Sequence, residues 1–323
     1  MTSEGKPHFY AEHARDLKRD LAAEIPGESL RVLHRRTAWK HFTIAAWQFS
    51  LMAACGVLSW KCVTPFIWIP AAVIQGFTVF NFTVMLHEVV HRTIFKGKHE
   101  HLYAALGWLY ALPTGLSASQ FTKWHLDHHA ELGSDLADPK RHRLTPKRNA
   151  RWLKLLYFTP ALFAIYFRAA AQETATYEKP LRRKILRERT AAIALHVGFA
   201  AFALWTGGLA VLLRVYAIPV FLIFPVAFAV NRLGQHYAID PEDVAAWSTR
   251  MRRSRLWEVV FLGSHYHLEH HDFPGVPFYN LRKLNALLSP FLERRGIPER
   301  RFGQILFLYL VRNKTPHTDW DLA

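Results

Sequence analysis

The chain has 323 residues, a formal net charge of +16 and 51% hydrophobic residues. Its mean hydropathy is +0.00, but this average hides long uncharged segments that alternate with strongly basic ones. The two cysteines, Cys55 and Cys62, give no basis for a disulfide framework or a cysteine-ligated metal. Residues 1–40 are charged and lack an apolar core, so no signal peptide is predicted.

Four uncharged segments come in two pairs along the chain. Residues 42–60 and 62–86 are separated by Lys61, and residues 190–213 and 215–231 are separated by Arg214. About 20 apolar residues cross a bilayer as a helix, and about 17 can suffice. The pattern predicts an all-α integral membrane protein with four transmembrane helices in two hairpins, the second turning at or a few residues from Arg214.

A fifth uncharged segment, residues 102–121, is expected not to cross the membrane. Its second half is small and polar, and a crossing would put the histidines on either side of it on opposite faces. A re-entrant or interfacial helix is expected instead. Residues 155–167 are too short to span and are expected in the interface.

Charge placement predicts the orientation. Apart from Lys61 and Arg214, every Lys and Arg lies outside the two hairpin turns. The positive-inside rule then puts the N-terminus, residues 92–189 and the C-terminal third in the cytosol. We expect one domain over residues 1–323, with hairpins at about 42–86 and 190–231 and a cytosolic helical cap from 92–189 and 232–323. The basic excess fits anionic lipid, and no nucleic-acid motif accompanies it.

Helix signals occur in the cap. Asp240-Pro-Glu-Asp243 combines an N-cap residue, Pro and acids, and predicts a helix start; Thr145-Pro146 predicts another before Trp152. Asp272-Phe-Pro274 is expected to end a helix. No segment shows sustained alternation, so a β-rich domain is not predicted.

One histidine pattern occurs twice, as WHLDHH at residues 124–129 and YHLEHH at residues 266–271, and HEVVH occupies residues 87–91. Positions i, i+3 and i+4 share a helix face, so each hexapeptide is predicted to aim three imidazoles at one point. Imidazole is a common ligand of zinc, copper, nickel and iron. These motifs offer more ligands than one metal takes, which predicts a two-metal site.

The predicted ligands also include the histidine that follows the fourth uncharged segment, where the other motifs converge. Glu88, Asp127 and Glu269 are expected to accept hydrogen bonds from the far ring nitrogens of ligating histidines. The full set of predicted ligands is His87, His91, His125, His128, His129, His236, His267, His270 and His271.

Two alternatives stay open at this point. His87-Glu-Val-Val-His91 also matches the zinc protease pattern, in which Glu88 would be the general base. That interpretation uses two of the nine predicted ligands and leaves both hexapeptides without a role. A metal-binding membrane protein with a structural role is the other alternative.

The three motifs together resemble the membrane fatty acid desaturase and hydroxylase superfamily, in order, spacing and placement on two hairpins. The hexapeptides, Gln235-His-Tyr237 and His270-His-Asp-Phe-Pro274 resemble the sphingolipid Δ4-desaturase branch. The resemblance implies two iron ions, consumption of O₂ and removal of hydrogen from an unactivated methylene. It also implies that the isolated His236 is a ligand.

The expected function is desaturation of a fatty acyl or related lipid chain, and the alternative on the same scaffold is hydroxylation of an acyl chain, sterol or carotenoid. Electrons must come from outside, because the chain has no dinucleotide fingerprint, no iron–sulfur cysteine set and no haem motif. A basic cytosolic face suits a ferredoxin or a cytochrome b5 as the donor. A bacterial inner membrane and the endoplasmic reticulum are both compatible with the sequence.

Overall fold

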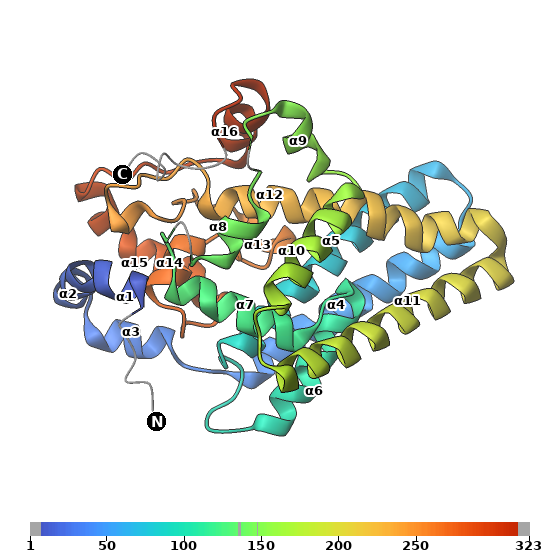
Figure 1. Cartoon of the computed structure of the whole chain (residues 1–323), viewed down its shortest axis with the longest axis horizontal. Helices are drawn as coiled ribbons and strands as arrows, with labels where there is room; N and C mark the ends of the chain where they lie inside the picture. The colour runs from blue at the N-terminus through green and yellow to red at the C-terminus, as the bar shows by residue number, and fades with distance from the viewer. Residues whose placement is uncertain (1–7, 135–136, 147, 316–323) are drawn as a thin grey trace.

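A computed structural model describes residues 8–134, 137–146 and 148–315, and these residues are organised almost entirely as helices (Figure 1). Within these ranges the one β contact is an isolated parallel bridge between Met251 and Arg300. The all-α prediction is confirmed.

The first long hairpin consists of α4 (Ala38–Lys61) and α5 (Pro65–Val90), which pack against each other. Their 24 and 26 residues exceed the number that a bilayer of about 30 Å requires. In α5, 72% of the most apolar window is buried inside the protein, against 22% in α4. α5 is therefore the central helix of the fold, and its last turn carries His87 into the interior.

The second long apolar segment covers Lys179–His236 and includes α11 (Lys179–Leu212), the π-helical segment η2 (Leu213–Ile223) and α12 (Phe224–His236). It is interrupted at Gly208, whose φ of 70° and ψ of −176° are not helical. A side chain would strain this conformation, so glycine permits the chain to reverse here. The reversal lies six residues before Arg214, and η2 packs against α5 and α11 (Figure 1).

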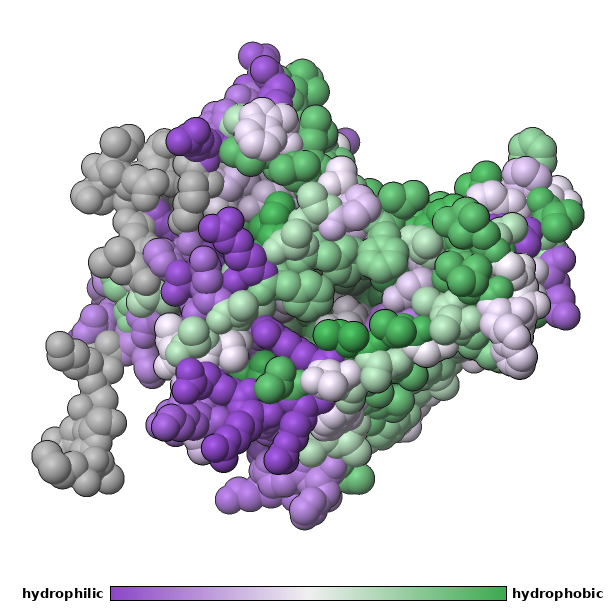
Figure 2. Space-filling view, turned by 45° about the vertical axis from the view of Figure 1, so that its right-hand side comes forward, coloured by the Kyte–Doolittle hydropathy of each residue, from purple (hydrophilic) through white to green (hydrophobic). Residues whose placement is uncertain are grey.

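By length and composition, three helices of the described chain can cross a membrane: α4, α5 and the interrupted segment Lys179–His236. Figure 2 shows that hydrophobic residues dominate the part of the surface formed by the long helices, whereas hydrophilic residues gather toward the end that carries the termini. Large apolar side chains such as Phe66 and Trp205 are 91% and 85% exposed. Extended apolar surfaces of this kind mark contact with membrane or protein, and the fold is that of an all-α membrane protein.

Residues 102–121 do not form one continuous helix. α6 (Glu100–Ala111) is followed by the short turn η1 (Leu112–Thr114), by Gly115 at a φ of 70°, and by α7 (Ala118–Ala130). The segment thus bends back, and it is not among the helices long enough to cross. Three shorter helices follow: α8 (Pro139–Leu144), α9 (Arg151–Leu156) and α10 (Ala161–Thr174).

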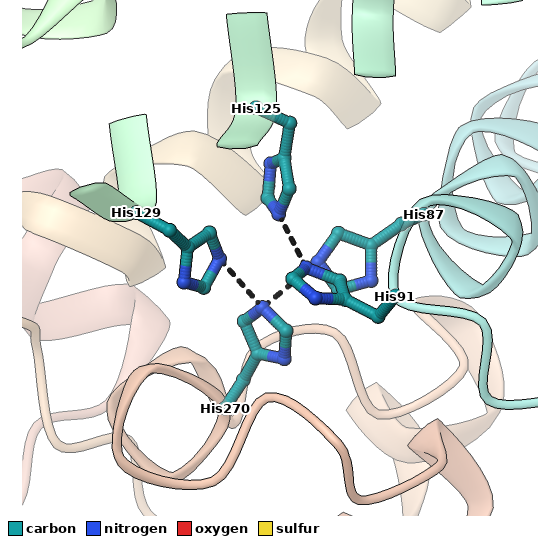
Figure 3. A group of neighbouring side chains, drawn as sticks. All are labelled: His87, His91, His125, His129 and His270. Carbon is teal, nitrogen blue, oxygen red and sulfur yellow. Dashed lines mark hydrogen bonds between the residues drawn. The ribbon is translucent and has the colours of Figure 1, made fainter. Parts of the chain in front are cut away.

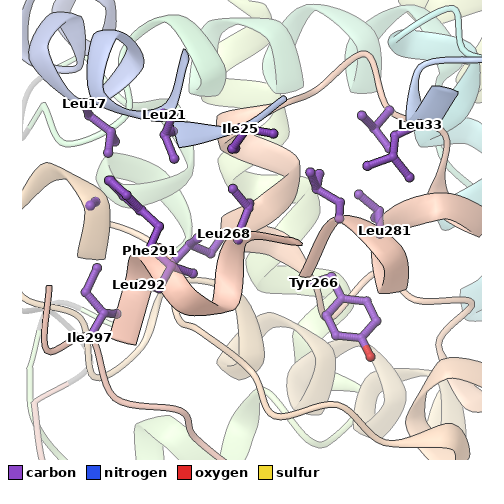
Figure 4. Packing of buried hydrophobic residues seen from close by; sticks show 14 of the residues in the cluster. Leu17, Leu21, Ile25, Leu33, Tyr266, Leu268, Leu281, Phe291, Leu292 and Ile297 are labelled. Carbon is purple, nitrogen blue, oxygen red and sulfur yellow. The ribbon is translucent and has the colours of Figure 1, made fainter. Parts of the chain in front are cut away.

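The N-terminal helices cover the C-terminal part of the cap. Side chains of α2 and α3, including Leu17, Leu21 and Leu33, are buried in one cluster with Leu268 and Leu292 (Figure 4). This apolar layer packs directly against the segment that carries the second hexapeptide. The elements involved are α1 (Phe9–His13), α2 (Arg15–Glu24), α3 (Gly27–Leu33), α14 (His267–Asp272), η4 (Phe278–Asn280) and α15 (Leu281–Arg294).

The remaining elements are η3 (Val244–Ala246), α13 (Arg255–Val260), α16 (Phe302–Leu306) and η5 (Phe307–Val311). The helix predicted to start at Asp240 was wrong, because only η3 forms there. The chain instead folds back on α12, with the Thr249 amide donating to the Gln235 carbonyl at 2.7 Å.

The start predicted at Thr145 was also wrong. Thr145 ends α8, and the next helix begins at Arg151. The predicted stop is confirmed, since α14 ends at Asp272.

Candidate metal centre

The structure brings the nine predicted ligands together in two groups of ring nitrogens. Within each group, all the nitrogens that can bind metal lie within 4.8 Å of one another. The first group contains His87, His91, His125, His129 and His270, and the second contains His128, His236, His267 and His271. The end of α5, the end of α12, and the helices α7 and α14 supply these side chains.

Each hexapeptide contributes to both groups, so the prediction that each would aim three imidazoles at one point was wrong. From α7, His125 and His129 enter the first group and His128 the second. From α14, His267 and His271 enter the second group and His270 the first. The cause is helical geometry: at about 100° per residue, i+4 lies about 40° from i, whereas i+3 lies about 60° away on the other side.

The rings of the first group face one another across a small central space (Figure 3). His87 Nε2 lies 3.0 Å from His270 Nε2, and His129 Nε2 lies 2.9 Å from the same atom. His91 Nε2 and His125 Nε2 are 2.8 Å apart. Five nitrogens from three separate elements are therefore directed at one another in the interior.

The second group is equally compact. His236 Nε2 lies 3.0 Å from His128 Nε2 and 2.9 Å from His267 Nε2, and His267 Nε2 lies 3.0 Å from His271 Nε2. His128, His267 and His271 are buried. His236, at the end of α12, is the ligand that no hexapeptide supplies, and the group would have three members without it.

The donor set fits divalent transition metals. Two nitrogens bound at right angles to one ion, each at about 2.1 Å, lie about 3.0 Å apart, close to the observed 2.8–3.0 Å spacings. Five nitrogens in one group exceed the four ligands of a typical zinc site. Burial lowers the pKa of His125, His129 and His270 well below its usual value, which favours the neutral imidazole that binds metal.

Two ring nitrogens of the second group are oriented by oxygen atoms. His128 Nδ1 donates to the Asp138 carboxylate at 2.9 and 3.0 Å, and His236 Nδ1 donates to the Trp247 carbonyl at 3.1 Å. Such contacts fix the tautomer, so that Nε2 keeps the lone pair for metal. In the first group, His125 Nδ1 instead contacts the Lys140 ammonium nitrogen at 3.1 Å.

The three carboxylates expected to support the ligands have other partners. Asp127 pairs with Lys123 on the outer side of α7 at 2.5 Å, and Glu269 accepts from the Asn285 amide. Glu88 is buried and accepts from the Thr93 hydroxyl and the Phe278 amide. Its oxygen lies 3.7 Å from His87 Nδ1, which is too long for a hydrogen bond.

The supporting residues that sequence analysis missed are Asp138, Lys140 and the Trp247 carbonyl. Asp138 was the easiest to find, because an Asp followed by Pro139 is an N-cap signal, and Asp138 does cap α8. The signal marks a helix start and carries no information about the contact with His128.

Two cavities border the histidines. The first cavity has apolar walls that include Phe80 and Val84 of α5 and Phe121 of α7, and it reaches members of both groups, among them His125 and His267. The second cavity reaches His128 and His236 and extends toward Tyr157, Leu162 and Tyr309. Lys140, Leu144, Phe228 and Arg232 line both cavities.

The chain is similar in sequence to known proteins. The fatty acid desaturase family model matches residues 63–303. The sphingolipid delta(4)-desaturase/C4-monooxygenase of Bos taurus is 25% identical over 288 residues, covering 85% of this chain and 81% of the relative. Dihydrorhizobitoxine desaturase of Bradyrhizobium elkanii is 25% identical over 256 residues, covering 74% and 72%.

A sphingolipid delta(4)-desaturase of Drosophila melanogaster is 27% identical over 242 residues, covering 73% of this chain and 69% of the relative. The family match spans most of the described residues and includes all nine histidines of the two groups. The chain belongs to the fatty acid desaturase family and is an oxidoreductase of the lipid desaturase type.

Proposed function

We propose that the two histidine groups hold two iron ions and that the enzyme uses O₂ to place a double bond in a fatty acyl or related lipid chain. The observation that supports this most strongly is the arrangement of nine imidazole nitrogens in two adjacent groups. The ligands would be His87, His91, His125, His129 and His270 for one ion, and His128, His236, His267 and His271 for the other.

Iron, when bound, supplies the redox chemistry with O₂ that breaking a methylene C–H bond requires, which zinc cannot supply. The protein's own residues position the metal and the substrate. Asp138 and the Trp247 carbonyl hold His128 and His236 in the required tautomer. The aromatic and aliphatic walls of the first cavity, such as Phe80 and Phe121, would hold an acyl chain beside the ligands and keep water away.

The membrane arrangement belongs to the same proposal. α4, α5, the part of α11 before Gly208, and η2 with α12 would form four crossings in two hairpins. The metal centre would then lie at the cytosolic face under the cap of residues 92–189 and 232–323. The basic residues outside the hairpin turns favour that side.

Electrons would come from a ferredoxin or a cytochrome b5. The chain has no sequence motif for a nicotinamide, flavin or haem cofactor, and its net charge of +16 favours association with an acidic partner.

Hydroxylation is the second candidate function. It is favoured by one observation, namely that the Bos taurus relative is named as both a desaturase and a C4-monooxygenase. Both outcomes begin with hydrogen removal and differ in positioning at the scale of an ångström.

The zinc protease alternative does not account for all five histidines of the first group. His87 and His91 lie there with three further histidines from α7 and α14, whereas the protease motif supplies two ligands and a catalytic glutamate.

The test is lipid mass spectrometry on a host that expresses the protein with a reductase and a ferredoxin, beside a His236→Ala variant. A product that lacks two hydrogens, absent from the variant, supports desaturation, and its fragmentation places the double bond. A product with one added oxygen would move the assignment to hydroxylation. If neither product forms although the purified protein binds iron, the proposed reaction is wrong.

A further inference from the structure

Two basic side chains lie beside the metal centre, on the walls that the two cavities share. Lys140 comes from α8 and Arg232 from the last turns of α12. The first cavity also contacts His125 and the second contacts His128. A molecule in either cavity therefore occupies a space that both basic groups line.

Neither basic group forms an ion pair within 4.0 Å with a carboxylate among the described residues, although both interact electrostatically with Asp138. No side-chain hydrogen bond and no carboxylate within 4.0 Å is found for Arg232 there, and the polar neighbour found for the Lys140 ammonium is His125 Nδ1 at 3.1 Å. Two buried cations of this protein do have oxygen acceptors: Arg250 donates to Glu293 and the Ile297 carbonyl, and Lys154 donates to the Tyr309 carbonyl. Both side chains are partly buried, and burying a charge without a close counter-ion is costly, so their position beside the metal centre requires an explanation.

One nearby carboxylate, Asp138, interacts with both basic groups, so two cations share one negative charge. Asp138 already accepts from His128 Nδ1 and from the backbone amides of Lys140 and Arg141. Glu88, on the wall of the first cavity, accepts from Thr93 and from the Phe278 amide. The Asp138 oxygens therefore orient His128 and cap α8, and a Glu88 oxygen binds Thr93 and the Phe278 amide.

The metal centre adds to the excess of positive charge. All nine candidate ligands are histidines, and a neutral imidazole does not compensate the charge of a bound cation. With metal present, the space around Lys140 and Arg232 would therefore be more attractive to an anion than the side chains alone make it.

We infer that the substrate is an amphiphile with an anionic head group, a carboxylate or a phosphate, that binds between Arg232 and Lys140. The inference rests on the proposed function and names the substrate class for the same site. A guanidinium donates two parallel hydrogen bonds to such an oxyanion, and the ammonium adds a third donor. The hydrocarbon chain extends along the apolar wall of the first cavity, past Phe80, Val84 and Phe121.

The position of the head group also limits where the reaction occurs. The Lys140 nitrogen is 3.1 Å from His125 Nδ1, so an oxyanion bound to Lys140 would lie next to a residue that would hold the metal. The double bond is therefore introduced in the part of the chain nearest the anionic group, and a neutral amphiphile is a poorer substrate because it leaves the excess positive charge uncompensated.

The test measures binding and does not depend on turnover. Iron-loaded protein in detergent is titrated with decanoate, decyl phosphate and decanol, and the same titrations are made with Arg232→Gln and with the exposed control Arg252→Gln. We expect the natural protein to bind at least one of the two anions roughly tenfold more tightly than decanol, and Arg232→Gln to remove that preference while Arg252→Gln retains it. The stronger of the two anions identifies carboxylate or phosphate as the head group.

The inference is overturned if decanol binds the natural protein as tightly as both anions, a comparison that requires no variant. It is also overturned if Arg232→Gln, with iron content unchanged, keeps the preference for the anion. Lipid mass spectrometry reports separately on the reaction. A desaturated product together with no anion preference would defeat this inference alone, and an anion preference without any oxidised product would defeat the proposed reaction alone.

Discussion

The two histidine groups differ in what holds their rings. In the four-histidine group, a carboxylate and a carbonyl oxygen accept from the far nitrogens of His128 and His236. In the five-histidine group, the far nitrogen of His125 contacts the Lys140 ammonium, and the Glu88 carboxylate stands 3.7 Å from His87 Nδ1. The four-histidine group thus has two rings oriented by oxygen acceptors, whereas the five-histidine group has one more ligand but lacks such an acceptor at His87 and His125.

This difference indicates that the two groups depend to different degrees on each of their ligands for metal binding. Outer-shell acceptors fix ring orientation and raise ligand basicity, so the four-histidine group depends on each member and on its acceptors. The five-histidine group faces the first cavity through His87, His125 and His270 and can lose one nitrogen and still retain four. The following predictions test whether the groups differ in this way.

The largest expected effect is the difference in iron content and product yield between His236→Ala and His129→Ala. Removing His236 leaves three nitrogens in its group, whereas removing His129 leaves four in the other. We expect His236→Ala to lower metal affinity of its group by more than about 100-fold and to abolish product, because losing a ligand exceeds the 10–100-fold effect typical of outer-shell changes. His129→Ala is expected to retain more iron. Iron per chain and product yield are measured on both, and equal iron loss would contradict the comparison.

A smaller effect is expected from Asp138→Asn. Asparagine caps a helix as well as aspartate does, so α8 should persist, while His128 loses the charge on its acceptor. We expect a loss of about 10–100-fold in iron affinity or activity.

The matched control is Asp127→Asn. Asp127 also lies close in sequence to His128, but its partner is the partly exposed Lys123. Exposed ion pairs contribute little, about 0–1 kcal/mol, and we expect the iron content to change less than about twofold. If the two variants behave alike, Asp138 is not the group that orients His128.

The ligand set was accessible from sequence because the spacing of residues along a helix is fixed. The repeated hexapeptides predicted which helices would face the centre, and α7 and α14 have this arrangement. The same angular rule predicts that i+3 diverges from i and i+4, so the sharing of each hexapeptide between groups could have been derived without a structure.

Contacts between distant segments were not accessible in this way. Asp138 lies ten positions beyond His128 along the chain, and no periodicity predicts which acidic residue a turn brings back to a ring. Arg232 follows directly after the last uncharged segment, and from sequence it suggests only the end of a membrane helix. Its position on the wall of two cavities depends on how α12 packs against α5 and on the loops and helices that close the cavities.

The smallest expected effect comes from Ser248→Ala. The Ser248 hydroxyl lies 3.3 Å from His236 Nδ1, and the Trp247 carbonyl lies closer to the same atom, at 3.1 Å. The carbonyl remains in the variant and continues to fix the tautomer, so the hydroxyl contributes at most one neutral hydrogen bond, about 0.5–1.5 kcal/mol. We expect iron affinity to fall by no more than about tenfold and less than in Asp138→Asn, as measured by competition with a chelator. A loss as large as that of His236→Ala would mean that the hydroxyl, and not the carbonyl, orients the ring.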